Sequence, residues 1–336
     1  MTDTHPADFP QGPFLWRDLS WPDRRPVARL EMMRDGSPTG ERLSVAISPG
    51  DEICVATCTD IAEAGLWCSG FAHAEFDDTG LPRFRQVPCP RSNRLRQGQQ
   101  CPLCRHLDRF RPVHRVHRGS ELTEAARAYI DYPHWLYVAT FPDGTSKVGT
   151  AHERSKTSRL DQQAVALADY VALADDGVLV RELEDAVTQH VRLTQFKRVT
   201  TKLTSWLAPE SFETVARKHE QTVAKVAEFL DGFENRGFAP VEEAWSPGEF
   251  SAPFAEHLDD GSLWEAPDQW PSESATGRVV SGSGPFLLTG SAQNLAEGKL
   301  APPEVRSLVN MTALKNRACR TVSGANSRGE EQIRLF

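Results

Sequence analysis

The sequence predicts an α+β protein built from small antiparallel sheets flanked by amphipathic helices. Three observations support this class: strand and turn patterns at residues 134–149, a similar pair at 278–288, and apolar residues at helical spacing over 178–192 and 209–233. At 336 residues the chain is long enough for about two domains with hydrophobic cores. No stretch approaches the ~20 apolar residues of a membrane-spanning helix, so no membrane partner is predicted.

The N-terminal third divides into an expected tail and a small β unit. Residues 1–25 are rich in proline and tryptophan and lack the apolar core of a secretory signal, which predicts a cytoplasmic protein with an N-terminal tail. Residues 26–118 begin with strand-like segments that are interrupted by turn pairs at 35–36 and 49–50. Because six cysteines follow in this range, we expect a small β unit with a metal-binding segment.

The cysteines predict a structural zinc site. The chain has seven, and an odd count without a secretory signal favours a reducing compartment over a disulfide framework. Cys101 and Cys104 form a C-x-x-C unit, a spacing that lets two thiolates reach one tetrahedral Zn²⁺. Cys68 and Cys89 are the best second pair. The competing ligands for that second pair are Cys54, Cys58, His106, His114 and His117.

Charge is unevenly distributed along the chain. The net charge of −8 argues at first against a polyanionic partner. Between residues 82 and 118, however, ten arginines face one acidic residue, Asp108, so this segment carries +9 and the remainder −17. Such a cluster indicates an anion-binding surface with DNA or RNA as its partner, although a solvated basic loop has the same composition. The candidate anion-binding residues are Arg91, Arg94, Arg96, Arg105 and Arg109.

Residues 119–205 are expected to form a second domain that begins with a helix and a β-hairpin. Ser120 is a suitable N-cap for a helix over 121–130. Residues 134–140 are rich in aromatic and β-branched side chains, a Pro-Asp-Gly turn follows, and 146–149 form a second short strand. Antiparallel pairing of these two strands is therefore predicted.

Two helices are predicted after this hairpin. Apolar residues recur at i, i+4, i+7 and i+11 over 160–171 and predict the first helix, although 171–173 also fit a third strand. The second helix covers 178–192, and Glu184 lies within its apolar stripe, where an ionised carboxylate needs a cation or a hydrogen-bonding partner. The options left open for Glu184 are a divalent metal ion, an ion pair with Arg159, or an exposed position beside Arg181.

This part of the chain resembles the GIY-YIG nuclease superfamily. The resemblance covers about residues 135–191 and rests on Leu136-Tyr137-Val138, Lys147-Val148-Gly149, Arg159 and Leu183-Glu184. Together with the preceding cysteines, it is similar to an uncharacterised bacterial family that pairs zinc-ribbon-like cysteines with a GIY-YIG-like domain. The resemblance implies a zinc-ribbon-like segment followed by a small antiparallel sheet flanked by helices.

The resemblance also implies catalytic roles. Tyr137 would align or deprotonate the attacking water, Arg159 would neutralise charge on the phosphoryl group, and Glu184 would hold a Mg²⁺ or Mn²⁺ ion. Lys147 stands where the superfamily usually has a second tyrosine, and Trp135 replaces a glycine. The implied catalytic set is therefore Tyr137, Lys147, Arg159 and Glu184, in which Lys147 offers a point charge to phosphate.

Residues 206–336 are expected to form a C-terminal extension of one helix and one β-hairpin. Apolar residues over 209–233 predict the helix, and His219 on its apolar face is predicted to be a core histidine rather than a metal ligand. Residues 278–280 and 284–288 predict the hairpin.

Three functions are compatible with these patterns. The first is a Mg-dependent phosphodiesterase that acts on DNA or RNA. The second is a protein that binds nucleic acid without cutting it, which Lys147 in place of a tyrosine favours. The third is a scaffold recruited to small-molecule biosynthesis, where it handles a phosphate or sulfate ester leaving group; the acidic balance outside the arginine cluster favours it. The sequence identifies neither the substrate nor a protein partner.

Overall fold

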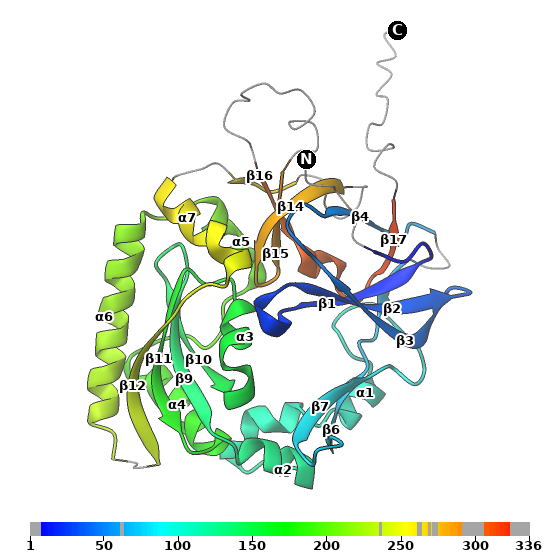
Figure 1. The fold of residues 1–336 in the computed structure, drawn as a ribbon. Helices are drawn as coiled ribbons and strands as arrows, with labels where there is room; N and C mark the ends of the chain where they lie inside the picture. The colour runs from blue at the N-terminus through cyan, green and yellow to red at the C-terminus, as the bar shows by residue number, and fades with distance from the viewer. Residues whose placement is uncertain are drawn as a thin grey trace.

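The computed structural model contains two main β-sheets, one mixed and nine-stranded, the other antiparallel and four-stranded (Figure 1). Two two-stranded ladders belong to the cysteine segment, which we define as residues 64–118. None of the described helices is long and apolar enough to cross a membrane. The structure describes residues 8–60, 64–234, 237–260, 264–267, 270, 275–290 and 306–322.

The nine-stranded sheet combines strands from both ends of the chain. Its order is β13-β16-β15-β14-β4-β17-β1-β2-β3, with β13 and β16 parallel and the other neighbours antiparallel. Its strands are β1 (Phe14–Ser20), β2 (Val27–Arg34), β3 (Ser37–Ala46), β4 (Glu52–Thr57), β13 (Trp264–Glu265), β14 (Ala275–Ser283), β15 (Phe286–Gly290), β16 (Arg306–Asn310) and β17 (Ala318–Thr321).

Strand β1 corrects the expectation that residues 1–25 form a tail. It pairs with β2 on one side and with β17 on the other, and Phe14, Leu15 and Trp16 are at most 1% exposed. Residues 1–7 of the expected tail lie outside the described residues. Because β17 comes from the opposite end of the chain, no local pattern around β1 reveals its partner. The expected ranges 26–118 and 206–336 likewise contribute strands to this one sheet.

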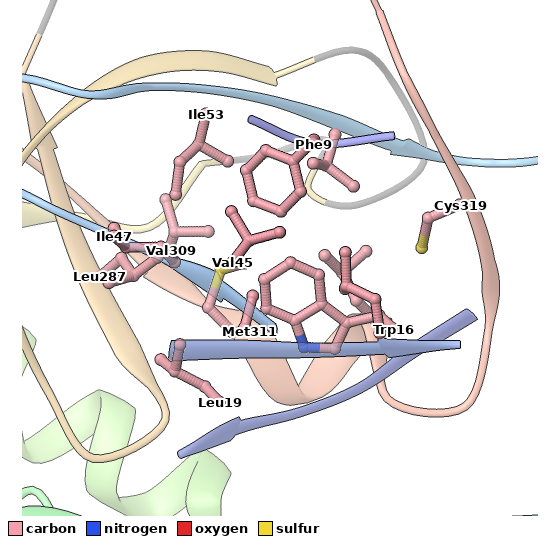
Figure 2. Packing of buried hydrophobic residues seen from close by; sticks show 14 of the residues in the cluster. Phe9, Trp16, Leu19, Val45, Ile47, Ile53, Leu287, Val309, Met311 and Cys319 are labelled. Carbon is pink, nitrogen blue, oxygen red and sulfur yellow. The ribbon is translucent and has the colours of Figure 1, made fainter. Parts of the chain in front are cut away.

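Apolar side chains from both chain ends form the core of the nine-stranded sheet. Figure 2 shows Phe9 and Trp16 from the N-terminal part beside Val309 and Met311 from the C-terminal part, and all four are buried. Burial of such a side chain contributes about 1.5–3 kcal/mol to the free energy of unfolding. The pairing of the two chain ends is therefore held by packing as well as by backbone hydrogen bonds.

The four-stranded sheet contains the predicted hairpin. Its order is β10-β9-β11-β12, and the register of β9 and β10 places Lys147 opposite Ala139 and Gly149 opposite Tyr137. Helices α4 and α6 cover one face, and the short helix α3 covers the other (Figure 1). The elements are β9 (His134–Thr140), β10 (Ser146–His152), α3 (Lys156–Asp161), β11 (Leu167–Ala174), α4 (Gly177–His190), α6 (Phe212–Asp231) and β12 (Phe238–Trp245).

The predicted helix over 160–171 is wrong. Leu160 lies near the end of α3, Ala164 has a φ of +52°, and the chain then enters β11, which includes the alternative strand at 171–173. Strand β11 is central and covered on both faces, so nearly all its side chains are apolar and their spacing fits either period. The helices predicted over 178–192 and 209–233 are confirmed as α4 and α6.

Two smaller expectations are also settled. The helix predicted over 121–130 begins at Glu124 with Thr123 as its N-cap residue, so Ser120 does not cap it. The predicted C-terminal hairpin is confirmed as β14 and β15. The remaining elements are β5 (Leu66–Trp67), β6 (Phe71–Phe76), β7 (Pro82–Val87), β8 (Arg94–Leu95), α1 (Pro102–Leu107), α2 (Glu124–Ile130), α5 (Val199–Leu207) and α7 (Ala252–Asp260).

Candidate functional site

Four buried cysteines lie close enough together to hold one metal ion. The sulfur atoms of Cys68, Cys89, Cys101 and Cys104 are all within 4.8 Å of one another. Cys68 follows β5, Cys89 follows β7, and the C-x-x-C unit begins α1, so the cluster joins three short elements that bury little apolar surface of their own. No other group of three or more potential ligands within such reach is found among the described residues.

The geometry of the cysteine cluster suits thiolates. The backbone N–H groups of Gly70 and Cys101 donate to Cys68 Sγ at 3.5 and 3.2 Å, and the N–H of Cys104 donates to Cys101 Sγ at 3.5 Å. The Cys89 and Cys101 sulfurs are 4.0 Å apart, close to the roughly 3.8 Å expected between sulfurs around a tetrahedral zinc ion. Burial raises the pKa of Cys101, but hydrogen bonds from Cys104 and Asn93 outweigh it and lower that pKa to about 6. Burial raises the pKa of Cys68 and Cys104, so a bound cation would be needed to hold all four sulfurs as thiolates.

Tyr137 and Lys147 form a buried pair on one face of the four-stranded sheet. They are 0% and 4% exposed, and Lys147 Nζ lies 3.4 Å from the hydroxyl oxygen of Tyr137. Tyr137 also explains the glycine opposite it: a Cβ atom on Gly149 would lie 2.5 Å from the tyrosine hydroxyl. The pair predicted from the sequence is thus brought together, with Gly149 providing the space.

Lys147 lines a cavity of about 350 Å³ between the two sheets. We call this cavity the lysine pocket. On one side it is bounded by β1 and by the turn at Met311–Leu314, and on the other by β10, α3 and α5 (Figure 1). Asp18 is the one acidic side chain among the described residues that line it. Its basic side chains are Lys147, Arg159, Lys197, Lys202 and Lys315.

The cations of the lysine pocket oppose one another. Burial, and then the charges of Lys147, Arg159 and Lys197, lower the pKa of Lys202 to about 7. The Lys202 ammonium donates to the backbone carbonyl and the side-chain oxygen of Gln163, at 2.8 and 3.1 Å, and neither acceptor carries a charge. Burial is the larger cause of this low pKa, and the neighbouring cations add to it; a bound anion would offset the contribution of those cations.

Glu184 is separated from this pocket. It is 5% exposed, and its carboxylate accepts a hydrogen bond from Arg181 at 2.6 Å, so its ion pair is with Arg181 and not with Arg159. Arg159 lies in α3 and lines the lysine pocket. Of the four implied catalytic residues, Lys147 and Arg159 line the lysine pocket, Tyr137 contacts Lys147 without being in the lining, and Glu184 lies outside it.

Two further cavities adjoin the lysine pocket. One, of about 600 Å³, lies between β1–β3 and the cysteine segment and shares Asp18 and Lys315 with it. The other, of about 380 Å³, shares Arg159 with it, and we call it the histidine cavity. Among the described residues, the three linings hold two carboxylates, Asp18 and Asp108. The cations of the three linings are Arg17, Arg29, Arg42, Arg111, Lys147, Arg159, Arg181, Lys197, Lys202 and Lys315.

The arginines predicted to bind anions lie on the surface of the cysteine segment. All five, Arg91, Arg94, Arg96, Arg105 and Arg109, are exposed. Other members of the arginine cluster are neutralised, because Arg83 and Arg85 both pair with Glu75, and Arg118 pairs with Asp185. The outer arginine surface is thus smaller than the sequence suggested. The cavities hold five further cations without a carboxylate partner among the described residues: Arg29, Arg111, Lys147, Arg159 and Lys202.

Sequence reasoning missed Lys197, Lys202 and Lys315. They are scattered along a chain whose basic residues are mostly arginines, and no motif connects them. His219 was predicted correctly as a core residue: it is 6% exposed and its ring nitrogens contact Thr140 and Asp169. Comparisons of the chain with protein-family models, with curated proteins and with solved structures found no match.

Proposed function

We propose that this protein binds single-stranded nucleic acid through phosphates held in its cationic cavities, with a structural zinc ion in the cysteine cluster. The observation that carries the proposal is the charge of the three adjoining cavities. Ten cations and two carboxylates line them in a chain whose net charge is −8. Five of these cations already have a carboxylate partner: Arg17 and Arg42 pair with Glu31, Arg181 with Glu184, Lys197 with Asp143 and Lys315 with Asp18. The other five, Arg29, Arg111, Lys147, Arg159 and Lys202, form no ion pair with a described residue. A group of cations in the cavities of a chain that is acidic as a whole favours a polyanionic ligand in those cavities.

The size of the lysine pocket favours an unpaired strand. A space of about 350 Å³ accommodates one nucleotide phosphate with part of its sugar, whereas a duplex is wider than the pocket. Phe196 also lines the pocket and is 72% exposed, the most exposed of the large hydrophobic side chains described. An exposed aromatic ring beside a phosphate site provides a surface on which a base stacks.

Metal-dependent hydrolysis has weaker support from the geometry. The hydrolysis implied by the GIY-YIG resemblance needs Glu184 to hold Mg²⁺ or Mn²⁺ beside Tyr137 and Arg159. The Glu184 carboxylate is instead buried and compensated by Arg181. A cation already supplies the charge that a divalent ion would bring, so we propose binding rather than cleavage as the activity of this site.

A second candidate function has one specific observation in its favour. Lys147 and Tyr137 are buried deeply, and a nucleic-acid surface does not require phosphate contacts at such depth. This favours a small phosphate or sulfate ester that is enclosed by the lysine pocket. A mononucleotide and an oligonucleotide therefore have to be compared directly.

The test measures fluorescence anisotropy of a labelled twelve-nucleotide single strand with the full chain at several salt concentrations. We expect binding whose affinity falls steeply with salt, and we expect Lys147→Met to weaken it at least tenfold. Lys225 lies exposed in α6 and lines none of the three cavities, so Lys225→Met is the matched control. Thermal denaturation of both variants shows whether they fold.

Three outcomes separate the candidates. Equal affinity of wild type and Lys147→Met for the strand contradicts the proposed site. Tighter binding of a mononucleotide than of the strand supports the small-ester function instead. Shortening of the strand in the presence of Mg²⁺, abolished by Glu184→Gln without loss of binding, restores hydrolysis as the function.

A further inference from the structure

The histidine cavity has the lining of an anion site. It lies where α2, the start of α4 and the end of β10 meet the 3₁₀ segment Arg111–Arg118. Arg159 and Arg181 line it, together with His114, His134 and His152. No aspartate or glutamate of the described residues is in this lining. An acceptor-rich, negatively charged group is therefore the complementary ligand.

His152 presents a buried donor without a hydrogen bond of good geometry. The residue is 4% exposed, and its Nδ1 accepts the backbone N–H of Arg154 at 3.0 Å. Burial, and then the nearby His134 and Arg154, lower the pKa of His152 to about 4, so the ring is neutral at pH 7. Its single proton is consequently on Nε2, and this atom is buried without a hydrogen bond of good geometry to a described residue, although the backbone carbonyl of Tyr129 lies near the ring and partly offsets the lowering of its pKa. Such a donor calls for an acceptor from a ligand.

His114 adds a second neutral ring to the same cavity. Its Nδ1 accepts a hydrogen bond from Arg181 at 3.4 Å, which places its proton on Nε2. His114 is exposed at the surface, but partial desolvation of its ring, and then the charges of Arg181 and Arg159, lower its pKa to about 4. Arg181 is held in place by Glu184 at 2.6 Å. The two cations and the two N–H groups thus line one space with no carboxylate in its lining, and of the two cations only Arg181 is already paired, with Glu184.

His134 supplies the opposite kind of group. Its Nδ1 lies 2.8 Å from the carbonyl oxygen of Tyr132, so Nδ1 carries the proton of the neutral ring and Nε2 is an acceptor. Burial lowers the pKa of His134, which favours this neutral form. The cavity thus has one acceptor, His134 Nε2, among the N–H donors of the other side chains. This set suits an oxyanion that keeps one proton, as a phosphate monoester does near neutral pH. Sulfate has no such proton.

Arg159 connects this cavity to the lysine pocket. It lines both, and no ion pair joins it to another described residue. A guanidinium has five N–H donors in a planar fork, so it can contact two anions on different sides. A ligand with two phosphates can therefore occupy both cavities at once.

We propose that the histidine cavity is a second phosphate site that binds a phosphate monoester, and that through Arg159 it reads the terminal phosphate of a strand whose next phosphate lies in the lysine pocket. The linking part of this inference rests on the proposed function of the lysine pocket. The cavity itself does not depend on that function.

The test compares two thymidine dinucleotides on the full chain by isothermal titration calorimetry. TpT has one internal phosphate, and pTpT has an additional 5′-terminal phosphate. We expect wild type to bind pTpT at least tenfold more tightly than TpT. His152→Asn should bring the ratio close to one, because the Asn oxygen can still accept the Arg154 N–H while the Nε2 donor is lost. His73 is exposed in β6 and lines none of the three cavities, so His73→Asn should keep the ratio.

The outcomes distinguish the two proposals. A wild-type ratio of one, or a ratio that His152→Asn leaves unchanged, overturns the assignment of a strand's terminal phosphate to the histidine cavity, whatever Lys147→Met does to TpT binding. Loss of TpT binding in Lys147→Met with a ratio of one supports the proposed function alone. Inorganic phosphate should reduce the ratio more than sulfate at the same concentration. If inorganic phosphate saturates the cavity while pTpT and TpT bind equally, the site takes free phosphate and the strand-end assignment fails.

Discussion

The cysteine cluster and the lysine pocket each gather like charges, but they differ in how those charges are compensated. Four thiol groups meet within 4.8 Å of one another, in a segment whose buried apolar residues Ala74, Val113 and Val116 pack in a separate cluster with α2. Five cations line the lysine pocket, where the two main sheets already provide a fold. We infer that the cysteine cluster binds a metal cation permanently, as part of its structure, whereas the lysine pocket binds an anion reversibly. On these proposals the cysteine cluster would stabilise the fold, whereas the lysine pocket would bind a ligand.

The largest expected effect is on the resident ion. Cys101→Ser removes a thiolate that the hydrogen bond from Cys104 prepares for metal binding. We expect zinc, measured by elemental analysis, to fall from about one ion per chain to none, and the melting temperature to fall by about 10 °C. Cys54 lies in β4 away from the cluster, so Cys54→Ala should keep its zinc. Unchanged zinc in Cys101→Ser contradicts the assignment.

The two sites also differ in how much of them the sequence predicts. The cysteine ligands were identified because a C-x-x-C turn is a local arrangement within four residues. The hairpin that carries Tyr137 and Lys147 was identified for the same reason. Lys197, Lys202 and Lys315 were not, because they meet only after β1 pairs with β17 and the two sheets pack together. Long-range pairing of this kind leaves no local period in the sequence.

The single failure of periodicity has a related cause. Strand β11 is buried from both sides, so its apolar run matched a helical spacing equally well. For Glu184 the spacing left open a divalent metal ion, an ion pair with Arg159 or an exposed position beside Arg181, and an ion pair with Arg181 was not among these options. Only the packing of α4 shows that Arg181, three residues earlier on the same helix, is the partner.

Glu184→Gln tests whether a second resident ion exists beside the lysine pocket. A buried carboxylate that pairs with Arg181 is structural, so we expect the free energy of unfolding to fall by about 1–3 kcal/mol in urea denaturation. Affinity for the single strand should stay within about twofold of wild type. If instead wild type cleaves the strand in the presence of Mg²⁺ and the variant does not, Glu184 binds a metal ion. Both sites would then contain a bound metal, and the difference proposed between them would be wrong.

Lys202 is expected to make both the stability of the protein and the anion affinity of the lysine pocket depend on pH. Its pKa in the folded protein is lowered to about 7 from the ordinary 10.5, so between these values the unfolded chain binds more protons. The stability of wild type relative to Lys202→Met should therefore rise as pH increases from about 7 to 10. A bound anion favours the ammonium form, so strand affinity should fall above pH 7, by up to about tenfold per unit. Lys202→Met should lack this dependence, and parallel pH profiles for the two proteins contradict it.

The smallest expected effect concerns the outer arginines. Arg96 is exposed on the cysteine segment with no ion pair to a described residue, whereas Arg83 is equally exposed to solvent on β7 but pairs with Glu75 at 2.9 Å. If the strand extends from the cavities over the cysteine segment, Arg96→Gln should reduce the slope of log affinity against log salt by about 0.7. Arg83→Gln should change it less, because Glu75 already neutralises that charge. If wild type and Arg96→Gln show the same slope of log affinity against log salt, Arg96 makes no phosphate contact. The phosphate contacts would then be restricted to the cavities.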